Sequence, residues 1–138
     1  MKKGFLMLMT AIFLAFGCDK NKNTPQPAPG EKDGITNLSA NGTANSYMVP
    51  KAGKYKFDAT VMGNGVSTRG INAQTLAPAT AELLWQDTKG VVSGIEIKDN
   101  TIVFDAGEAE GNAVIAAKDA SGKVIWSWHI WRTAYNPA

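Results

Sequence analysis

The sequence predicts an all-β fold, a single immunoglobulin-like antiparallel β-sandwich preceded by a lipoprotein signal peptide and a flexible linker. From residue 34 onward apolar side chains alternate with polar ones, which is typical of strands that bury one face. Clusters of Gly, Asp, Asn and Pro interrupt these runs about every ten residues, as in β-sandwiches. Cys18 is the only cysteine, so the mature domain cannot form an internal disulfide and must rely on its hydrophobic core.

Residues 1–17 have the order of features found in secretory signal peptides. Two lysines precede an apolar run over residues 5–16, which is shorter than the ~20 residues that a membrane-spanning helix needs. The run leads into the stretch LAFGC at residues 14–18, which resembles the lipobox of bacterial lipoproteins. The resemblance implies that Cys18 is acylated and becomes the N-terminus, so we expect attachment to a membrane through a lipid anchor. Ordinary signal cleavage is the alternative.

Residues 18–33 are expected to form a flexible, Pro-rich tether. After Cys18 they contain no apolar residue larger than alanine or proline, so they cannot bury themselves. Alternating prolines favour polyproline II at ~3.1 Å per residue, which would hold the following domain up to ~40 Å from the lipid surface. The β-sandwich domain is expected over residues 34–138.

Six to eight short strands are expected in this domain. In the clearest one, residues 54–61, one face carries Tyr55, Phe57, Ala59 and Val61, and the other face is polar. The other strand candidates are residues 43–49, 81–86, 91–97, 101–104, 111–117 and 123–132.

Turn chemistry separates these strands. The short loop at residues 119–122 joins two strongly apolar runs and predicts a hairpin. Residues 62–80 are Gly-rich at their start and contain Pro78, so they are expected to be a long connection that crosses between the sheets. A short strand around Ile71 is an open alternative.

The last expected strand is the most aromatic part of the domain. We expect one of its faces to be core, because exposed tryptophans would forfeit several kcal/mol of burial. That face carries Val124, Trp126, Trp128 and Ile130. The opposite, mixed face carries Ile125, Ser127, His129 and Trp131.

Two blocks of the domain resemble a known family. The first covers residues 41–57, the second covers residues 110–131 and ends in Trp-Ser-Trp-His-Ile-Trp, and Leu84-Trp85 lies between them. Both resemble the β-sandwich repeat of fimbrillin-like surface lipoproteins of Gram-negative gut commensals. The resemblance implies adhesins, pilus subunits or multidomain lipoproteins, and it assigns no catalytic residues. Larger members continue beyond the Trp-rich strand, so a truncated or minimal anchored repeat is expected, with polymerisation left open.

Charge and residue types exclude several functional classes. The formal net charge is +2, but without Lys2 and Lys3 the remaining 12 basic residues balance the 12 acidic ones, so no field attracts nucleic acid. His129 is the only histidine, which argues against catalytic relays and histidine metal sites. The Gly-rich loop at residues 63–70 lacks the Gly-Lys-Ser/Thr ending of a phosphate-binding loop. We therefore expect no enzyme activity and no cofactor.

The segment around Asp105, Glu108 and Glu110 is acidic and contains the oxygen ligands that calcium prefers. The spacing of these carboxylates does not fit an EF-hand, so a solvated turn is the preferred interpretation. No metal site is predicted.

Three residues remain as a hypothetical binding surface. Trp131, with His129 on its face, and Trp85 are suited to stacking a sugar ring. A tryptophan that seals the sandwich edge or packs on the tether is nevertheless the preferred interpretation of Trp131, because aromatic residues at strand ends usually fill space. Two functions are therefore carried forward. The first is a structural or adhesive surface module that contacts host, matrix or other cell-surface proteins. The second is a carbohydrate-binding accessory lipoprotein of a glycan-uptake system.

The membrane that holds the anchor is not fixed by the sequence. The fimbrillin-like resemblance implies the outer membrane, with the domain exposed on the cell surface. Asp19, directly after the lipid-bearing cysteine, resembles an inner-membrane retention signal of some bacteria. Both locations remain open, and the outer membrane is the expectation.

Overall fold

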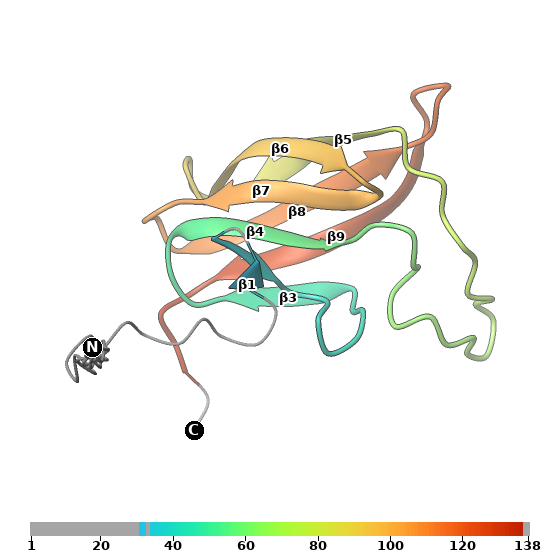
Figure 1. The fold of residues 1–138 in the computed structure, drawn as a ribbon, viewed down its shortest axis with the longest axis horizontal. Coiled ribbons are helices and arrows are strands. Elements are labelled where there is room, and N and C mark those ends of the chain that lie inside the picture. Colours follow the sequence, from blue (N-terminus) through green and yellow to red (C-terminus); the bar gives the residue numbers. More distant parts are fainter. Residues whose placement is uncertain (1–30, 33, 137–138) are drawn as a thin grey trace, which may run out of the picture.

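The computed structural model describes residues 31–32 and 34–136, and within them the fold is all-β without a helix (Figure 1). The predicted signal peptide and Cys18 lie outside the described residues, as does most of the predicted tether. The strands are β1 (Glu31–Lys32), β2 (Ile35–Asn37), β3 (Ser46–Val49), β4 (Gly53–Asp58), β5 (Thr80–Gln86), β6 (Val92–Lys98), β7 (Thr101–Ala106), β8 (Gly111–Lys118) and β9 (Val124–Arg132). No helix in this part of the chain is long and apolar enough to cross a membrane.

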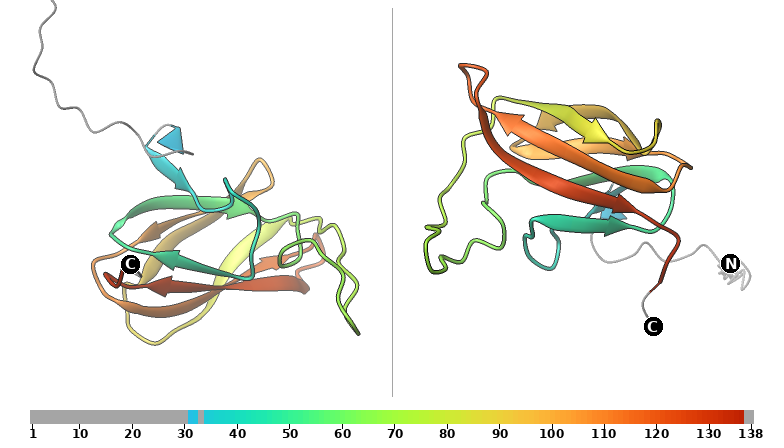
Figure 2. Two further views of the ribbon diagram at one scale, coloured as in Figure 1. Left: turned by 90° about the horizontal axis from the view of Figure 1, so that it is seen from below. Right: turned by 180° about the vertical axis from the view of Figure 1, so that it is seen from behind.

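The strands form two sheets packed face to face. One has the order β1-β2-β4-β7-β6 and the other the order β3-β9-β8-β5. The right panel of Figure 2 looks onto the four-stranded sheet, with β8 and β9 at its centre. Apolar side chains of both sheets meet between them, which is the arrangement of a β-sandwich.

The expectation of a purely antiparallel sandwich is wrong at two places. β2 runs parallel to β4, and β3 runs parallel to β9, whereas the other strand pairs of the described chain are antiparallel. Alternating apolar residues specify which face a strand buries, but they carry no information about the direction of its neighbour. The parallel pairs involve β2 and β3, two short strands that the chain visits in succession while it crosses from one sheet to the other.

The seven strand candidates correspond to β3 to β9, with bounds that differ by a few residues. The two additional strands are short. β2 lies against β4 with all three residues half-buried, so it lacks the alternation that marks a strand in the sequence. β1 falls within the segment expected to be tether and pairs with β2.

Aromatic side chains fill the centre of the sandwich. Phe57 of β4 is fully buried, and its ring centroid lies 5.0 Å from that of Tyr47 and 5.2 Å from that of Trp128. Phe104 packs edge-on against Phe57 at 6.2 Å. Such pairs contribute about 0.5–1.5 kcal/mol each beyond the burial of their surface. The core predicted on one face of β4 is thus confirmed for Tyr55, Phe57 and Ala59.

The inner face of β9 differs from its prediction at the start of the strand. Trp128 and Ile130 are buried as expected, but Val124 is exposed and Trp126 is only partly buried. The register between β8 and β9 shifts there, because Ala117 pairs with Trp126 and the next residue of β8 pairs with Val124. The extra residue, Ile125, turns toward the core and packs against it. A strict period of two therefore fails at this bulge.

Arg132, at the end of β9, is buried although it is charged. Its Nε donates to the carbonyl oxygen of Gly107 at 3.0 Å, and its Nη1 donates to that of Pro50 at 3.2 Å. The two carbonyls belong to the loops β7–β8 and β3–β4. Each of these loops crosses between the two sheets, so one side chain links two crossover loops. The two bonds offset part of the cost of removing the guanidinium from water.

The connection between β4 and β5 crosses from the five-stranded to the four-stranded sheet, as predicted for residues 62–80. It protrudes from one end of the sandwich (Figure 1). In place of a strand around Ile71, the structure has an isolated bridge between Thr68 and Ile71, and a second bridge joins Val61 to Thr75.

Candidate ligand-binding surface

The outer face of the four-stranded sheet brings the predicted binding residues together. Side chains that pair directly across a ladder point to the same face of the sheet. One row across all four strands consists of the paired residues Trp85, Val114, His129 and Ser46. The next row consists of Asn112, Trp131 and Met48. This surface, the outer face, opposes the core side of the same strands.

Both tryptophans of the outer face are accessible. Trp85 is 54% exposed and Trp131 is 40% exposed. Trp85 follows a bulge in β5, where the register with β8 shifts between Leu83 and Trp85. Trp131 lies two strands away from Trp85 and two residues beyond the residue of β9 that is in line with Trp85, which is His129. With ~4.8 Å between strands and ~3.4 Å per residue along a strand, the Cα atoms of the two tryptophans are about 12 Å apart. Trp131 lies on β9, with Met48 of β3 paired to it on one side and Asn112 of β8 on the other.

A chain of hydrogen bonds crosses the outer face between the tryptophans. Ser46 Oγ lies 2.7 Å from His129 Nδ1, and His129 Nε2 lies 2.9 Å from Asn112 Oδ1. Asn112 Nδ2 then donates to Asp87 Oδ2 at 2.8 Å, and its backbone N–H donates to Asp87 Oδ1 at 2.9 Å. We call these four residues the polar chain. It joins β3, β9, β8 and the turn after β5.

The direction of each bond in the polar chain follows from its acidic end. The Asp87 carboxylate can only accept, so the amide nitrogen of Asn112 faces it and the amide oxygen faces His129. That oxygen is also an acceptor, so His129 Nε2 carries the proton and donates. In the neutral imidazole Nδ1 is then an acceptor, and the hydroxyl of Ser46 donates to it. The chain thus holds His129 in one tautomer.

The polar chain also sets the charge of the face. The hydrogen bonds from Asn112, first from its side chain and then from its backbone, hold the pKa of Asp87 below its ordinary value. Asp87 therefore remains a carboxylate throughout the physiological pH range. Its remaining oxygen lone pairs, together with those of Ser46 Oγ, are acceptors for a ligand that offers hydroxyl or N–H groups.

A serine hydroxyl bonded to a histidine nitrogen is also the arrangement that nucleophilic catalysis uses. Acyl transfer needs more than this pair, namely donors that converge on an oxyanion and a site that excludes water. Ser46 lies exposed on an open sheet face. Water therefore reaches this Ser–His pair.

The other sequence motifs lie apart from the outer face. Asp105 points outward from the five-stranded sheet and forms an ion pair with Lys54 at 3.1 Å, while Glu110 accepts a hydrogen bond from Thr133 at 3.4 Å. The described residues contain no group of three or more His, Cys, Asp or Glu side chains that could hold a metal ion. The Gly-rich loop at residues 63–70 belongs to the protruding connection between β4 and β5.

Sequence reasoning found Trp85, His129 and Trp131 but missed Ser46, Asn112 and Asp87. The alternation along the strands at residues 43–49 and 111–117 is enough to assign Ser46 and Asn112 to outward faces. The predicted hairpin at residues 119–122 places β8 beside β9, but the sequence contains no signal that β3 is the other neighbour of β9. Comparison of the chain with known proteins finds no matching family model, no matching curated protein and no matching solved structure.

Proposed function

We propose that this protein is a lipid-anchored surface module of the fimbrillin-like, immunoglobulin-like β-sandwich type, which makes structural or adhesive contacts at the cell surface of the outer membrane. The observation that carries the proposal is the pair of exposed tryptophans, Trp85 and Trp131, on the outer face of one sheet. The sequence at residues 14–18 supplies the anchor, and the Pro-rich residues 19–30 supply the spacer that precedes β1.

The outer face has the composition of a contact surface. Tryptophan is enriched where proteins bind partners, because it combines a large apolar area with a polar edge. Met48 lies beside Trp131 and is also exposed, and Leu84 lies beside Trp85. Host, matrix or neighbouring cell-surface proteins are the partners that such a face fits, and nothing in the charge of the chain favours nucleic acid.

A second function, glycan binding as an accessory lipoprotein of a glycan-uptake system, is favoured by one specific observation. The polar chain lies between the two tryptophans, so acceptor atoms alternate with stacking platforms. Sugar rings combine an apolar face with hydroxyl donors and match that pattern. With the tryptophans about 12 Å apart, a short oligosaccharide would bridge them and a monosaccharide would not.

Protease shaving of intact cells tests the surface location on which the adhesive function depends. Loss of the domain from intact cells is expected, with permeabilised cells as the control in which every pool is accessible. Protection until permeabilisation would place the domain in the periplasm and refute the adhesive function. It would leave only a role inside the envelope.

A double substitution, Trp85→Ala with Trp131→Ala, tests the outer face itself. We expect it to abolish binding of the protein to host cells or matrix, while Tyr135→Ala, which alters an exposed aromatic residue after β9, leaves binding unchanged. Quenching of tryptophan fluorescence by neutral polysaccharide, lost in the double variant, would favour the glycan function over protein contacts. If both variants bind cells like the wild type, the outer face is not the contact surface.

A further inference from the structure

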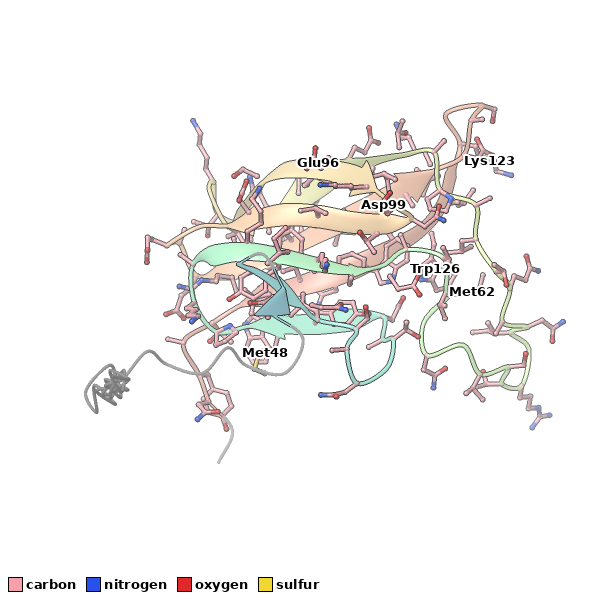
Figure 3. All side chains as sticks on the ribbon, in the orientation of Figure 1. Met48, Met62, Glu96, Asp99, Lys123 and Trp126 are labelled. Atoms are coloured by element: carbon pink, nitrogen blue, oxygen red, sulfur yellow. The ribbon has the colours of Figure 1, made fainter. Side chains whose placement is uncertain are left out.

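A hollow of about 400 Å³ lies at the end of the sandwich where the long connection leaves it. It is bounded by the residues just before β3, by Trp126 of β9 and by the connection itself, and Figure 3 shows Trp126 beside Met62 at this place. Ten residues line the hollow, and none of them is charged. It shares no lining residue with the outer face, and its volume lies within the range of small-molecule sites, roughly 300–1,000 Å³.

The floor of the hollow is held in place by the core. Trp126, Ala44 and Met62 pack against the buried cluster of the sandwich. Trp126 is also fixed in rotation, because its Nε1–H donates to Asn45 Oδ1 at 2.7 Å. An indole that is packed on one side and hydrogen-bonded at its edge presents a preformed surface, so a ligand would not have to order it.

The opposite wall is an apolar part of the connection. Val66 is 61% exposed and Ile71 is 56% exposed, and both line the hollow. Two backbone hydrogen bonds between Thr68 and Ile71, of 2.9 and 3.0 Å, hold this wall in a tight turn. A molecule seated between the wall and Trp126 would remove both aliphatic side chains from water, which is favourable at ~25 cal/mol per Å² of apolar surface.

The polar side chains that line the hollow are the Thr68 hydroxyl, which can donate or accept, and two amides. Asn45 Oδ1 accepts a hydrogen bond from the indole N–H of Trp126, and Asn64 Oδ1 accepts one from the backbone N–H of Val66 at 3.0 Å. Both assignments are fixed, because an indole N–H and a backbone N–H can only donate and must face the amide oxygens. The Nδ2–H groups of Asn45 and Asn64 are therefore the atoms that each amide can offer to a ligand. A complementary ligand carries acceptor oxygens.

We propose that this hollow is a binding site for an uncharged, flat aromatic molecule that bears acceptor oxygen atoms. The ring of the ligand packs between Trp126 and the aliphatic wall, and its oxygens accept from Asn45 and Asn64. An ionic ligand is disfavoured, since no side chain in the lining compensates the loss of its hydration. A sugar is also a poor fit, because its hydroxyl donors would face Val66, Ile71 and Met62.

The test uses coumarin, a neutral aromatic lactone, titrated into the ¹⁵N-labelled protein and followed by NMR. We expect saturable shifts of the Trp126 indole N–H and of the Asn45 and Asn64 side-chain amides, with the indole of Trp131 unmoved. Ile71→Asp should weaken binding by about ten-fold or more, because it replaces an apolar contact by a charge. Ile71→Val is the matched control that keeps the wall apolar, and it should bind nearly as the wild type does.

Three results would overturn the proposal. The first is the absence of saturable shifts at Trp126 up to the solubility limit of coumarin. The second is equal binding of the anion coumarin-3-carboxylate, or of cellobiose, at the same resonances. The third is unchanged affinity in Ile71→Asp, provided that its spectrum shows a folded domain, which the exposure of Ile71 leads us to expect.

Discussion

The two inward-facing tryptophans of β9 differ in one hydrogen bond, and this difference leads to an unusual prediction. Trp128 is 1% exposed, and its Nε1–H has no hydrogen-bond partner among the described residues. Trp126 is less buried, but its Nε1–H donates to Asn45 Oδ1. Replacing either tryptophan by phenylalanine removes the indole N–H, which is unpaired in Trp128 and hydrogen-bonded in Trp126. Trp126→Phe is therefore a matched control for Trp128→Phe.

The magnitude for Trp128→Phe follows from opposing contributions. Phenylalanine buries roughly 50 Å² less apolar surface than tryptophan, which costs about 1.2 kcal/mol. Incomplete closure of the space left behind adds up to about 1 kcal/mol. Against these losses, removing a buried and unpaired N–H recovers about 1–3 kcal/mol. We therefore expect the free energy of unfolding of Trp128→Phe to lie between about 1 kcal/mol below and about 2 kcal/mol above the wild-type value.

For Trp126→Phe the contributions have the same sign. The half-buried ring loses about 0.6 kcal/mol of packing, and the lost hydrogen bond to Asn45 costs about 1 kcal/mol, for a total of about 1.5 kcal/mol. The less buried residue should thus be the more costly one to replace. This ordering is opposite to the one that burial alone predicts.

Equilibrium urea unfolding followed by far-UV circular dichroism is the appropriate assay, since both substitutions alter tryptophan fluorescence. A difference of 1 kcal/mol would also shift the melting temperature by about 4–8 °C for a domain of this size. The reasoning is refuted if Trp128→Phe loses more than about 3 kcal/mol, because a loss of that size would show that the indole N–H is not a net cost in the wild type.

Two further predictions concern Asp87 and the backbone. Asn112→Ala should raise the pKa of Asp87 toward its ordinary value, as measured by ¹³C NMR of the carboxyl group, because the side-chain hydrogen bond from Asn112 is the largest cause of its lowered pKa. A lowered pKa of Asp87 stabilises the folded protein above the unfolded-state pKa of about 3.9, and this stabilisation is lost as the pH falls through the folded-state pKa. The difference in stability between the wild type and Asn112→Ala should therefore shrink in acid. A difference that stays constant with pH would contradict this. Gly107→Ala should lower the melting temperature severely, because a Cβ there would collide with the carbonyl oxygen of Gly90. Gly122→Ala, at φ 83° but with open space around it, should cost only about 1 kcal/mol, and similar effects of the two glycine variants on thermal unfolding would contradict the steric argument.

The strands themselves could be predicted from local patterns. In β4 the alternation of Tyr55 and Phe57 with lysines identified both the strand and its buried face, because the period of two belongs to the extended backbone itself. The hairpin between β8 and β9 was likewise marked by its turn residues, where Asp119 accepts hydrogen bonds from the backbone N–H groups of Ser121 and Lys123. Short strands without alternation, such as β2, gave no comparable signal.

Apart from the β8–β9 hairpin, the pairing of strands was decided only by the tertiary structure. The parallel contacts of β2 with β4 and of β3 with β9 depend on where the chain crosses between the sheets. The alternation of apolar residues along a strand carries no information about that crossing. The bulges near Ile125 and Leu84 were also decided by the tertiary structure. A bulge is an extra residue in one strand relative to its partner, so it is visible only once the partner strand is known.

The candidate sites likewise contain residues that the sequence could predict and contacts that only the tertiary structure creates. Trp85, His129 and Trp131 could be named from the sequence because aromatic and titratable residues are recognisable by type. The polar chain joins Ser46 to His129 across 83 residues of sequence, and the hollow sets Asn45 against Trp126 across 81. Such contacts exist only once four strands have been placed side by side. The sequence by itself determined the all-β class and most of the strand faces, since these follow from local composition and period. The lipid anchor at Cys18 stays a prediction. Which side chains meet was decided by long-range packing, whose free energy is not encoded in any single segment.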